Sequence, residues 1–128
     1  MKQGHPHETD DCRAISKILQ RLGDKWTVLI VSKLGESEQP MRFNELRRTV
    51  GGISQKMLTS ALRGLEADGF VTRTVFPTIP PRVDYELTEL GREFLTPVSG
   101  LVVWAKENGA RIIAARMGAA TELREAAE

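Results

Sequence analysis

A row of polar side chains between residues 54 and 63 has the chemistry needed to bind a DNA duplex. Apolar residues recur at helical spacing along this stretch, so positions three or four residues apart share the opposite, exposed face. That face and its N-terminal border carry hydroxyl, amide, amine and guanidinium groups from Ser54, Gln55, Lys56, Thr59, Ser60 and Arg63. Such groups hydrogen-bond base edges and phosphates in a major groove. An exposed helix face is more often simply solvated, so this row needs support from the rest of the chain.

The helix that carries this row has clear start and stop signals. Ser54 is a favoured N-cap, because its hydroxyl accepts a hydrogen bond from a backbone N–H of the first turn. Gly69 suits the left-handed residue that closes a helix, and Phe70 follows it as in a Schellman motif. The stripe expected to face the core consists of Met57, Leu58, Ala61, Leu62 and Leu65.

The segments on both sides of this helix predict a winged helix-turn-helix. A short extended piece at 41–43 leads into a helix at about 44–50, and Gly51-Gly52 then makes a tight turn. In a helix-turn-helix the second helix enters the major groove. Alternating segments at 71–75 and 83–87 are joined by a connection with three prolines, which makes it stiff. We expect this rigid hairpin to be a wing, with its apolar face closing the core.

The charge distribution favours a DNA-facing surface in the middle of the chain. Residues 41–75 contain six basic and three acidic side chains, although the formal net charge of the whole chain is only +1. Ordinary scatter of surface charge is the alternative explanation. The side chains expected mainly to contact the DNA backbone are Arg42, Arg47, Arg73 and Arg82.

Three further helices are predicted around this unit. The first begins at Asp10 or Asp11 and ends at Gly23; the second, from Lys25 to about Leu34, is apolar nearly all round and belongs at the centre of the domain. The last begins after Thr88 and reaches about Met117 with more apolar surface than the rest can cover. We therefore expect a two-fold homodimer. The interface residues expected from the first and last helices are Ile15, Leu19, Leu95, Val98, Leu101, Val102 and Trp104.

Length and composition limit the alternatives. The 128 residues predict a disordered tail at 1–10, one domain at 11–117 and a C-terminal tail at 118–128. No apolar run could span a bilayer, and the N-terminus lacks an apolar signal region, so the expected compartment is the cytoplasm. His5, His7 and Cys12 lack the spacing of metal ligands. We expect no metal and no cofactor.

Several motifs in the right order together resemble the HxlR-type winged-helix transcriptional regulators, which are related in fold to the MarR group. The resemblance covers about residues 12–105. The matching stretches are Gly-Asp-Lys-Trp-Thr (23–27), Arg-Phe-Asn-Glu-Leu-Arg-Arg (42–48), Ile-Ser-Gln-Lys-Met-Leu-Thr (53–59), Leu-Glu-Ala-Asp-Gly-Phe-Val (65–71), Pro-Pro-Arg-Val-Asp-Tyr-Glu-Leu-Thr (80–88) and Trp104.

The resemblance implies a dimeric DNA-binding repressor or activator without enzymatic activity. It places Ser54, Gln55, Lys56, Thr59 and Arg63 in the recognition helix, and it places Pro80, Pro81 and Arg82 in the wing. Thr78, in the connection between the two strands, is a further candidate DNA contact. It also aligns Cys12 with a cysteine that senses oxidants or electrophiles in several members of the family.

Physical arguments for Cys12 as a sensor point both ways. A helix N-terminus near Arg13 and Lys17 favours the reactive thiolate, whereas Asp10 and Asp11 disfavour it. Cys12 is also in phase with the apolar face of its helix, where a thiol would be inert. As the single cysteine of the chain, it could be oxidised only to a disulfide between subunits, a mixed disulfide or an adduct.

The sequence thus predicts a mainly α (α+β) fold, a winged helix-turn-helix with a two-stranded wing and dimerisation helices at both ends. The predicted function is transcriptional regulation by a homodimer on an inverted-repeat double-stranded DNA operator, with an oxidant or electrophile as effector through Cys12. The alternative is a winged-helix protein-interaction module without specific DNA binding. An enzyme is disfavoured, since no paired acid–base motif or phosphate-binding loop is present.

Overall fold

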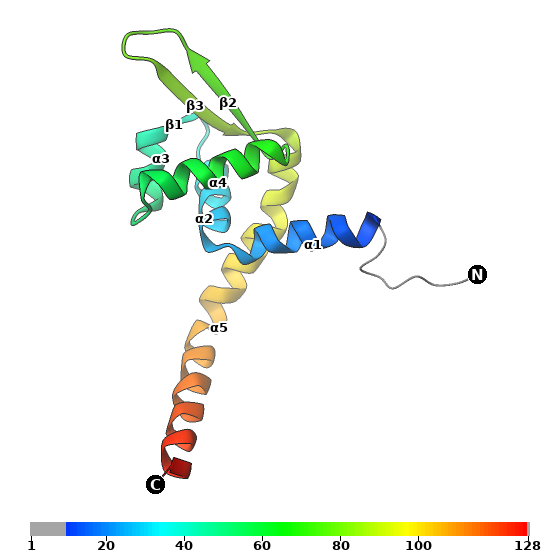
Figure 1. Ribbon diagram of the computed structural model, residues 1–128, viewed down its shortest axis with the longest axis vertical. Helices are drawn as coiled ribbons and strands as arrows, with labels where there is room; N and C mark the ends of the chain where they lie inside the picture. The colour runs from blue at the N-terminus through cyan, green and yellow to red at the C-terminus, as the bar shows by residue number, and fades with distance from the viewer. Residues whose placement is uncertain (1–9, 128) are drawn as a thin grey trace, which may run out of the picture. The chain divides into compact units, whose positions relative to one another are not determined.

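The computed structural model describes residues 10–127 as a mainly helical chain with one small sheet (Figure 1). Residues up to Val98 form one compact unit, and those from Ser99 onward form a second. The elements in chain order are α1 (Asp10–Gly23), α2 (Lys25–Glu36), β1 (Met41–Arg42), α3 (Phe43–Val50), α4 (Gln55–Ala67), β2 (Val71–Phe76), β3 (Arg82–Leu87) and α5 (Glu89–Ala127).

Helix α2 contributes the centre of the core, as its apolar circumference predicts. Asp24 caps it by accepting a hydrogen bond from the backbone N–H of Trp26 at 3.0 Å. The hydroxyl of the fully buried Thr27 donates to the same carboxylate at 3.4 Å. The buried apolar side chains that α2 contributes to the core are Ile30, Val31 and Leu34.

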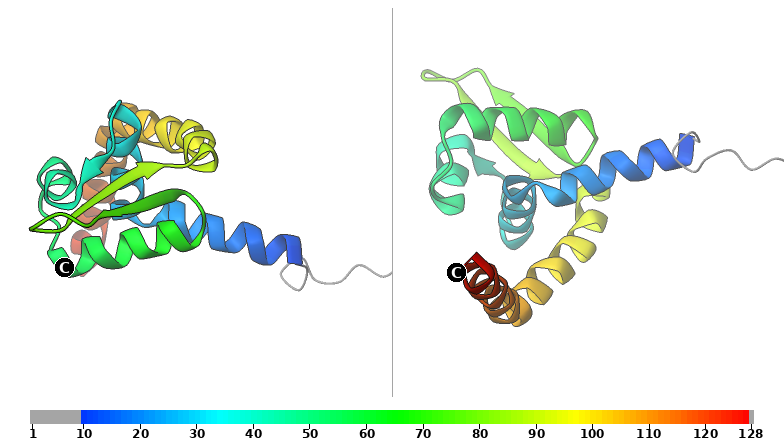
Figure 2. Two further views of the ribbon diagram at one scale, coloured as in Figure 1. Left: turned by 90° about the horizontal axis from the view of Figure 1, so that it is seen from above. Right: turned by 60° about the horizontal axis from the view of Figure 1, so that its bottom comes forward.

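The sheet has three strands in the order β1-β3-β2, all antiparallel. The predicted two-stranded wing is present as β2–β3, paired from Val71 with Leu87 to Phe76 with Arg82. The extended piece before α3 adds β1 to the other edge of β3, with Met41 opposite Tyr85. Figure 1 and Figure 2 both show the hairpin running alongside α4, with its closed end on the same side as α3.

Helix α4 has the predicted caps at both ends. The Ser54 hydroxyl accepts from the Met57 N–H at 3.1 Å. At the other end Gly69 has φ 84°, and the Phe70 N–H donates to the Leu65 carbonyl at 2.9 Å, as in a Schellman motif. One inward-facing prediction is wrong, since Met57 is 48% exposed. It lies about 100° round the helix from the buried Leu58, at the margin of the apolar stripe.

Helix α5 begins as predicted, but it extends further. The Thr88 hydroxyl accepts from the Gly91 N–H at 3.0 Å and so caps it. The helix then continues to Ala127, so the domain boundary predicted at residue 117 is not the end of an element. Val98 is 0% exposed inside the core of its own chain. Its predicted place in a dimer interface is therefore wrong, because no part of its side chain is left to contact a second copy.

Two sequence-based expectations concern the chain ends and membranes. The predicted tail at 1–10 lies outside the described residues apart from Asp10, which begins α1. Among the helices of residues 10–127, none combines the length and the apolar character needed to cross a membrane.

Candidate nucleic-acid interface

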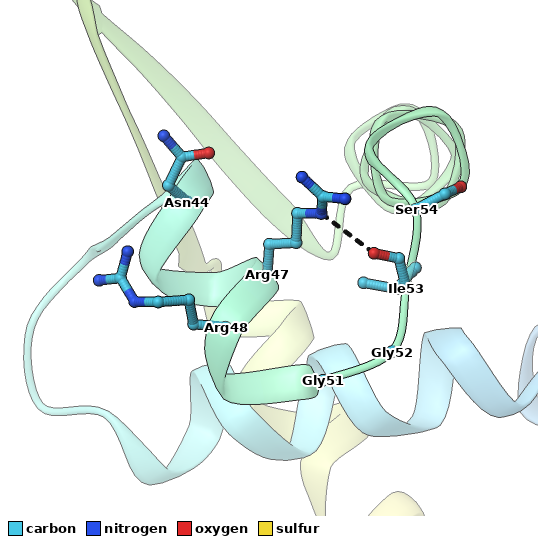
Figure 3. Close-up of a pocket in the computed structure, with 7 residues that line it drawn as sticks. All are labelled: Asn44, Arg47, Arg48, Gly51, Gly52, Ile53 and Ser54. Atoms are coloured by element: carbon cyan, nitrogen blue, oxygen red, sulfur yellow. Dashed lines mark hydrogen bonds between the residues drawn. The ribbon is translucent and has the colours of Figure 1, made fainter.

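The turn between α3 and α4 is closed by two glycines and one arginine. Gly51 and Gly52 have φ values of 75° and 70°, a backbone region that residues with a Cβ rarely adopt. The Gly51 N–H donates to the Arg47 carbonyl at 3.0 Å. The Arg47 side chain crosses the turn, and its Nε donates to the Ile53 carbonyl at 3.0 Å (Figure 3). This contact holds the two helices of the motif together.

A surface hollow opens beside this turn at the N-terminus of α4. The first N–H groups of a helix have no acceptor within the helix, and they give this end a partial positive charge. Asn44 and Arg48 of α3 contribute to its lining, although in Figure 3 the Arg48 side chain extends to the side of α3 away from Ser54. Such a hollow suits a phosphate group chemically. It is lined by Asn44, Arg47, Arg48, Gly51, Gly52, Ile53 and Ser54.

The polar row of α4 lies at the surface. Gln55, Lys56, Ser60 and Arg63 are exposed and Thr59 is half-buried, so the predicted orientation of this face is confirmed. Together these five residues line a shallow hollow along α4. The face therefore presents amide, amine, hydroxyl and guanidinium groups without protein atoms covering them. Whether these groups bind DNA stays a prediction.

A second hollow separates α4 from the hairpin. Gln55, Thr59 and Arg63 line it from the helix, and Arg73 lines it from β2. The predicted recognition residues and the predicted backbone contact at Arg73 thus lie beside the same depression, together with the acidic Glu66. Arginines on both walls give this depression a cationic character that suits a nucleic-acid backbone.

Arg82 contacts other residues of the wing. The Arg82 guanidinium carbon lies 4.0 Å from the centroid of the Phe76 ring, and its Nε lies 3.4 Å from Oδ1 of Asp84. The Thr78 hydroxyl donates to the Pro80 carbonyl at 2.8 Å, while Pro80 and Pro81 are exposed. Arg82 was expected to reach outward. The structure instead holds its inner nitrogen against the hairpin, and the side chain keeps about a third of its surface exposed.

The wing tip also lies beside α3, which brings further residues to the site. One hollow is shared by the tip and by the exposed Arg42, Asn44 and Arg48. Asn44 and Arg48 were absent from the predicted site residues. Their spacing of four residues, on the helix face next to Arg47, was the signal that could have identified them.

Cys12 lies in the first turn of α1 and is partly buried; it forms no disulfide within the chain. Within residues 10–127, no group of three or more His, Cys, Asp or Glu side chains is placed to hold a metal ion.

The apolar residues predicted at a dimer interface divide into two groups. Ile15 and Leu19 on α1 are 53% and 59% exposed, and Leu101 and Trp104 are 43% and 54% exposed. Val102 is half-buried, and Leu95 packs against the core, so these two offer less surface than expected.

Comparison with known proteins identifies clear relatives. The sequence profile described as HxlR-like helix-turn-helix matches residues 21–112. The HTH-type transcriptional regulator YtfH of Escherichia coli (strain K12) is 40% identical over 100 residues, which cover 78% of each chain. The structure of ytfH from Salmonella typhimurium has a TM-score of 0.72 at 38% identity and covers 80% of this chain and 89% of that one. The redox regulator HypR in its reduced form has a TM-score of 0.70 at 37% identity, covering 79% and 98%.

Proposed function

Since this chain belongs to the HxlR-like helix-turn-helix family of transcriptional regulators, we propose that it binds a specific DNA operator as a homodimer. The observation that carries the proposal is the exposed polar face of α4, which lies between the arginines of α3 and Arg73 of the hairpin. Base contacts come from this face, because its side chains have the donors and acceptors that read base edges.

The groups around α4 position the duplex. Arg42, Arg48 and Arg73 are exposed and contact phosphates, and the hollow at the N-terminus of α4 takes one phosphate group. The wing tip, with Thr78, Pro80, Pro81 and Arg82, follows the neighbouring groove. Two copies related by a two-fold axis place their α4 helices in successive major grooves, about 34 Å apart, on an inverted repeat.

The dimer is supported by apolar surface that the chain does not cover by itself. Ile15 and Leu19 on α1, and separately Leu101 and Trp104 on α5, are large apolar side chains with about half of their surface exposed. Burial of such side chains against a second copy supplies the free energy of association.

The DNA-binding proposal is tested by titrating DNA that flanks the gene with purified protein at several salt concentrations. Log affinity should fall steeply with log salt, because phosphate contacts release counterions. Arg63→Ala should weaken operator binding by roughly 10-fold to 100-fold, the worth of one good base contact. The matched control is Arg92→Ala, since Arg92 is exposed on α5 and lies outside the candidate interface.

The same titration distinguishes operator binding from the alternative function, a protein-interaction module. A winged helix that binds only proteins predicts no salt-dependent DNA binding and no difference between Arg63→Ala and Arg92→Ala. That result would contradict the operator proposal.

We further propose that Cys12 makes the regulator responsive to oxidants or electrophiles. The proposal is supported by the similarity to HypR, which is a redox regulator, and by the place of the thiol in the first turn of α1. Oxidation of two Cys12 thiols to one disulfide between subunits transfers two electrons to the oxidant and releases two protons. A mixed disulfide or an electrophile adduct is the corresponding reaction of a single thiol.

Cys12→Ser tests this response. Oxidant treatment should release the wild-type protein from DNA, and it should leave the variant bound. Equal release of both proteins would exclude Cys12 as the sensor.

A further inference from the structure

One side chain of α1 reaches the end of α4. The Arg21 Nε donates to Oδ2 of Asp68 at 2.5 Å, and Asp68 is the C-cap residue of α4. The two residues are 47 positions apart in the sequence, so the contact joins separate segments of the first unit.

The same guanidinium lies directly on the backbone of α4 at Gly64. A Cβ at residue 64 would be only 2.6 Å from one terminal nitrogen of Arg21 and 2.8 Å from the other. Only glycine leaves room for this approach. Glycine in a helix interior costs roughly 1 kcal/mol relative to alanine, and here it makes space for the arginine.

The end of α4 that Arg21 holds is also bonded to the start of α5. The Thr88 hydroxyl donates to the Gly69 carbonyl at 2.6 Å, and the Thr88 N–H donates to the Phe70 carbonyl at 3.0 Å. The rings of Phe70 and Phe94 stack with their centroids 4.3 Å apart. The three residues that follow α4 therefore connect it to α1 on one side and to α5 on the other.

The Arg21–Asp68 ion pair has a geometric rather than a stabilising role. Both side chains are about one-third exposed, and ion pairs in that setting contribute little to stability. A planar guanidinium with a carboxylate at its edge and a helix backbone beneath it nevertheless restricts how the two helices can turn relative to each other.

We infer that Arg21 is a positioning residue that sets the orientation of α4 relative to α1. Its consequence for DNA rests on the proposed function, because α4 is the proposed recognition helix and α1 a proposed dimerisation helix. Loss of Arg21 should let α4 take a wider range of orientations, so that fewer molecules match the operator at any moment.

The geometric part of the inference is tested without DNA. In a Cys12→Ser background, spin labels at Ser16→Cys on α1 and Ser60→Cys on α4 report the distance between the helices. Labelled protein is diluted into excess unlabelled protein, so that pairs within one chain dominate. Arg21→Ala should broaden the distance distribution, whereas Lys17→Ala, which removes another exposed cation of α1, should leave it unchanged.

A second variant checks the same contact from the other helix. Gly64→Ala should broaden the distribution as Arg21→Ala does, because the new Cβ displaces the guanidinium. In the double variant the two effects should not add, since both remove one contact. A distribution unchanged by Arg21→Ala, or additive effects in the double variant, would overturn the inference.

The DNA part is read from affinity and salt dependence together. Arg21→Ala should weaken operator binding by about 2-fold to 30-fold, the range expected for residues that couple elements without touching the ligand. The slope of log affinity against log salt should stay at the wild-type value, because no phosphate contact is lost. A slope reduced by about one would instead make Arg21 a direct DNA contact and refute the positioning role.

The DNA titration and the label distances test the proposed function and the inference independently. If the wild-type protein binds no DNA, the proposed function is wrong, while the label distances still decide whether Arg21 orients α4. If the protein binds DNA and the distances do not depend on Arg21, only the inference is wrong.

Discussion

At the scale of single residues, the neighbouring Arg47 and Arg48 of α3 differ in the direction and contacts of their side chains. The Arg47 side chain is directed across the turn to the Ile53 carbonyl, whereas Arg48 extends away from the turn (Figure 3). The sequence predicted Arg47 as a contact to the DNA backbone, whereas Arg48 was absent from the predicted site residues. Their difference depends on where the turn returns the chain, which is a property of the folded motif.

This difference predicts distinct effects on stability. Arg47→Ala should lower the free energy of unfolding by about 1–2 kcal/mol, because a charge-assisted hydrogen bond is lost and the Ile53 carbonyl is left without it. Arg48→Ala should change it by less than about 0.5 kcal/mol, as expected for an exposed residue. Urea unfolding of the two variants measures both values. Equal losses would show that the bond across the turn has no energetic weight.

Arg82 shows a similar limit of residue-level prediction. Its place at the exit of the hairpin tip suggested a side chain that reaches for phosphates. In the fold it stacks on Phe76, because the strand register places these two residues opposite each other. Its planar group therefore packs within the wing, whereas the sequence predicted only a contact to the DNA backbone.

At the scale of elements, the caps made the helices predictable. Asp24, Ser54 and Thr88 each accept a hydrogen bond from the first turn that follows, as the residue types indicated. The signals of α4 lie within a few residues of its ends, so they act in the same way whatever the rest of the chain does. The pairing of β1 with β3 had no local signal, because its partner strand lies about forty residues further along the chain.

Replacement by alanine should have opposite effects on stability at two glycines of α5, Gly91 and Gly100. A Cβ at Gly91 would be 2.1 Å from the Phe70 carbonyl oxygen, which is held by the Thr88 N–H and cannot easily move. Gly91→Ala should therefore cost about 1–3 kcal/mol of stability, as overpacking typically does.

Gly100→Ala is the matched control in the same helix. Apart from its chain neighbours and the backbone of its own helix, nothing lies within 4 Å of a Cβ at that position, so the change should increase stability by roughly 0.5–1 kcal/mol through helix propensity. Thermal unfolding at one fixed protein concentration compares the two. Stabilisation by both substitutions would show that the start of α5 is packed less closely than described.

At the scale of the whole molecule, self-association is the remaining prediction. Leu101→Asp should weaken the dimer by roughly 10-fold or more, because it places a charge in a surface expected to be buried by the second copy. Ile79→Asp is the control, since Ile79 is fully exposed at the wing tip. Sedimentation velocity over a range of concentrations measures both. A wild-type protein that stays monomeric at micromolar concentration would contradict the proposal.

The sequence by itself determined the helix caps, the glycine turn, the hairpin and the polar face of α4. These features depend on neighbouring residues and on the periodicity of apolar positions, and both can be read from short stretches of the sequence. Only the tertiary structure decided that Val98 is core, that Arg47 closes a turn and that Arg21 lies on Gly64. Each of these depends on which segments pack together, and that choice is made by burial of the whole core rather than by any single stretch.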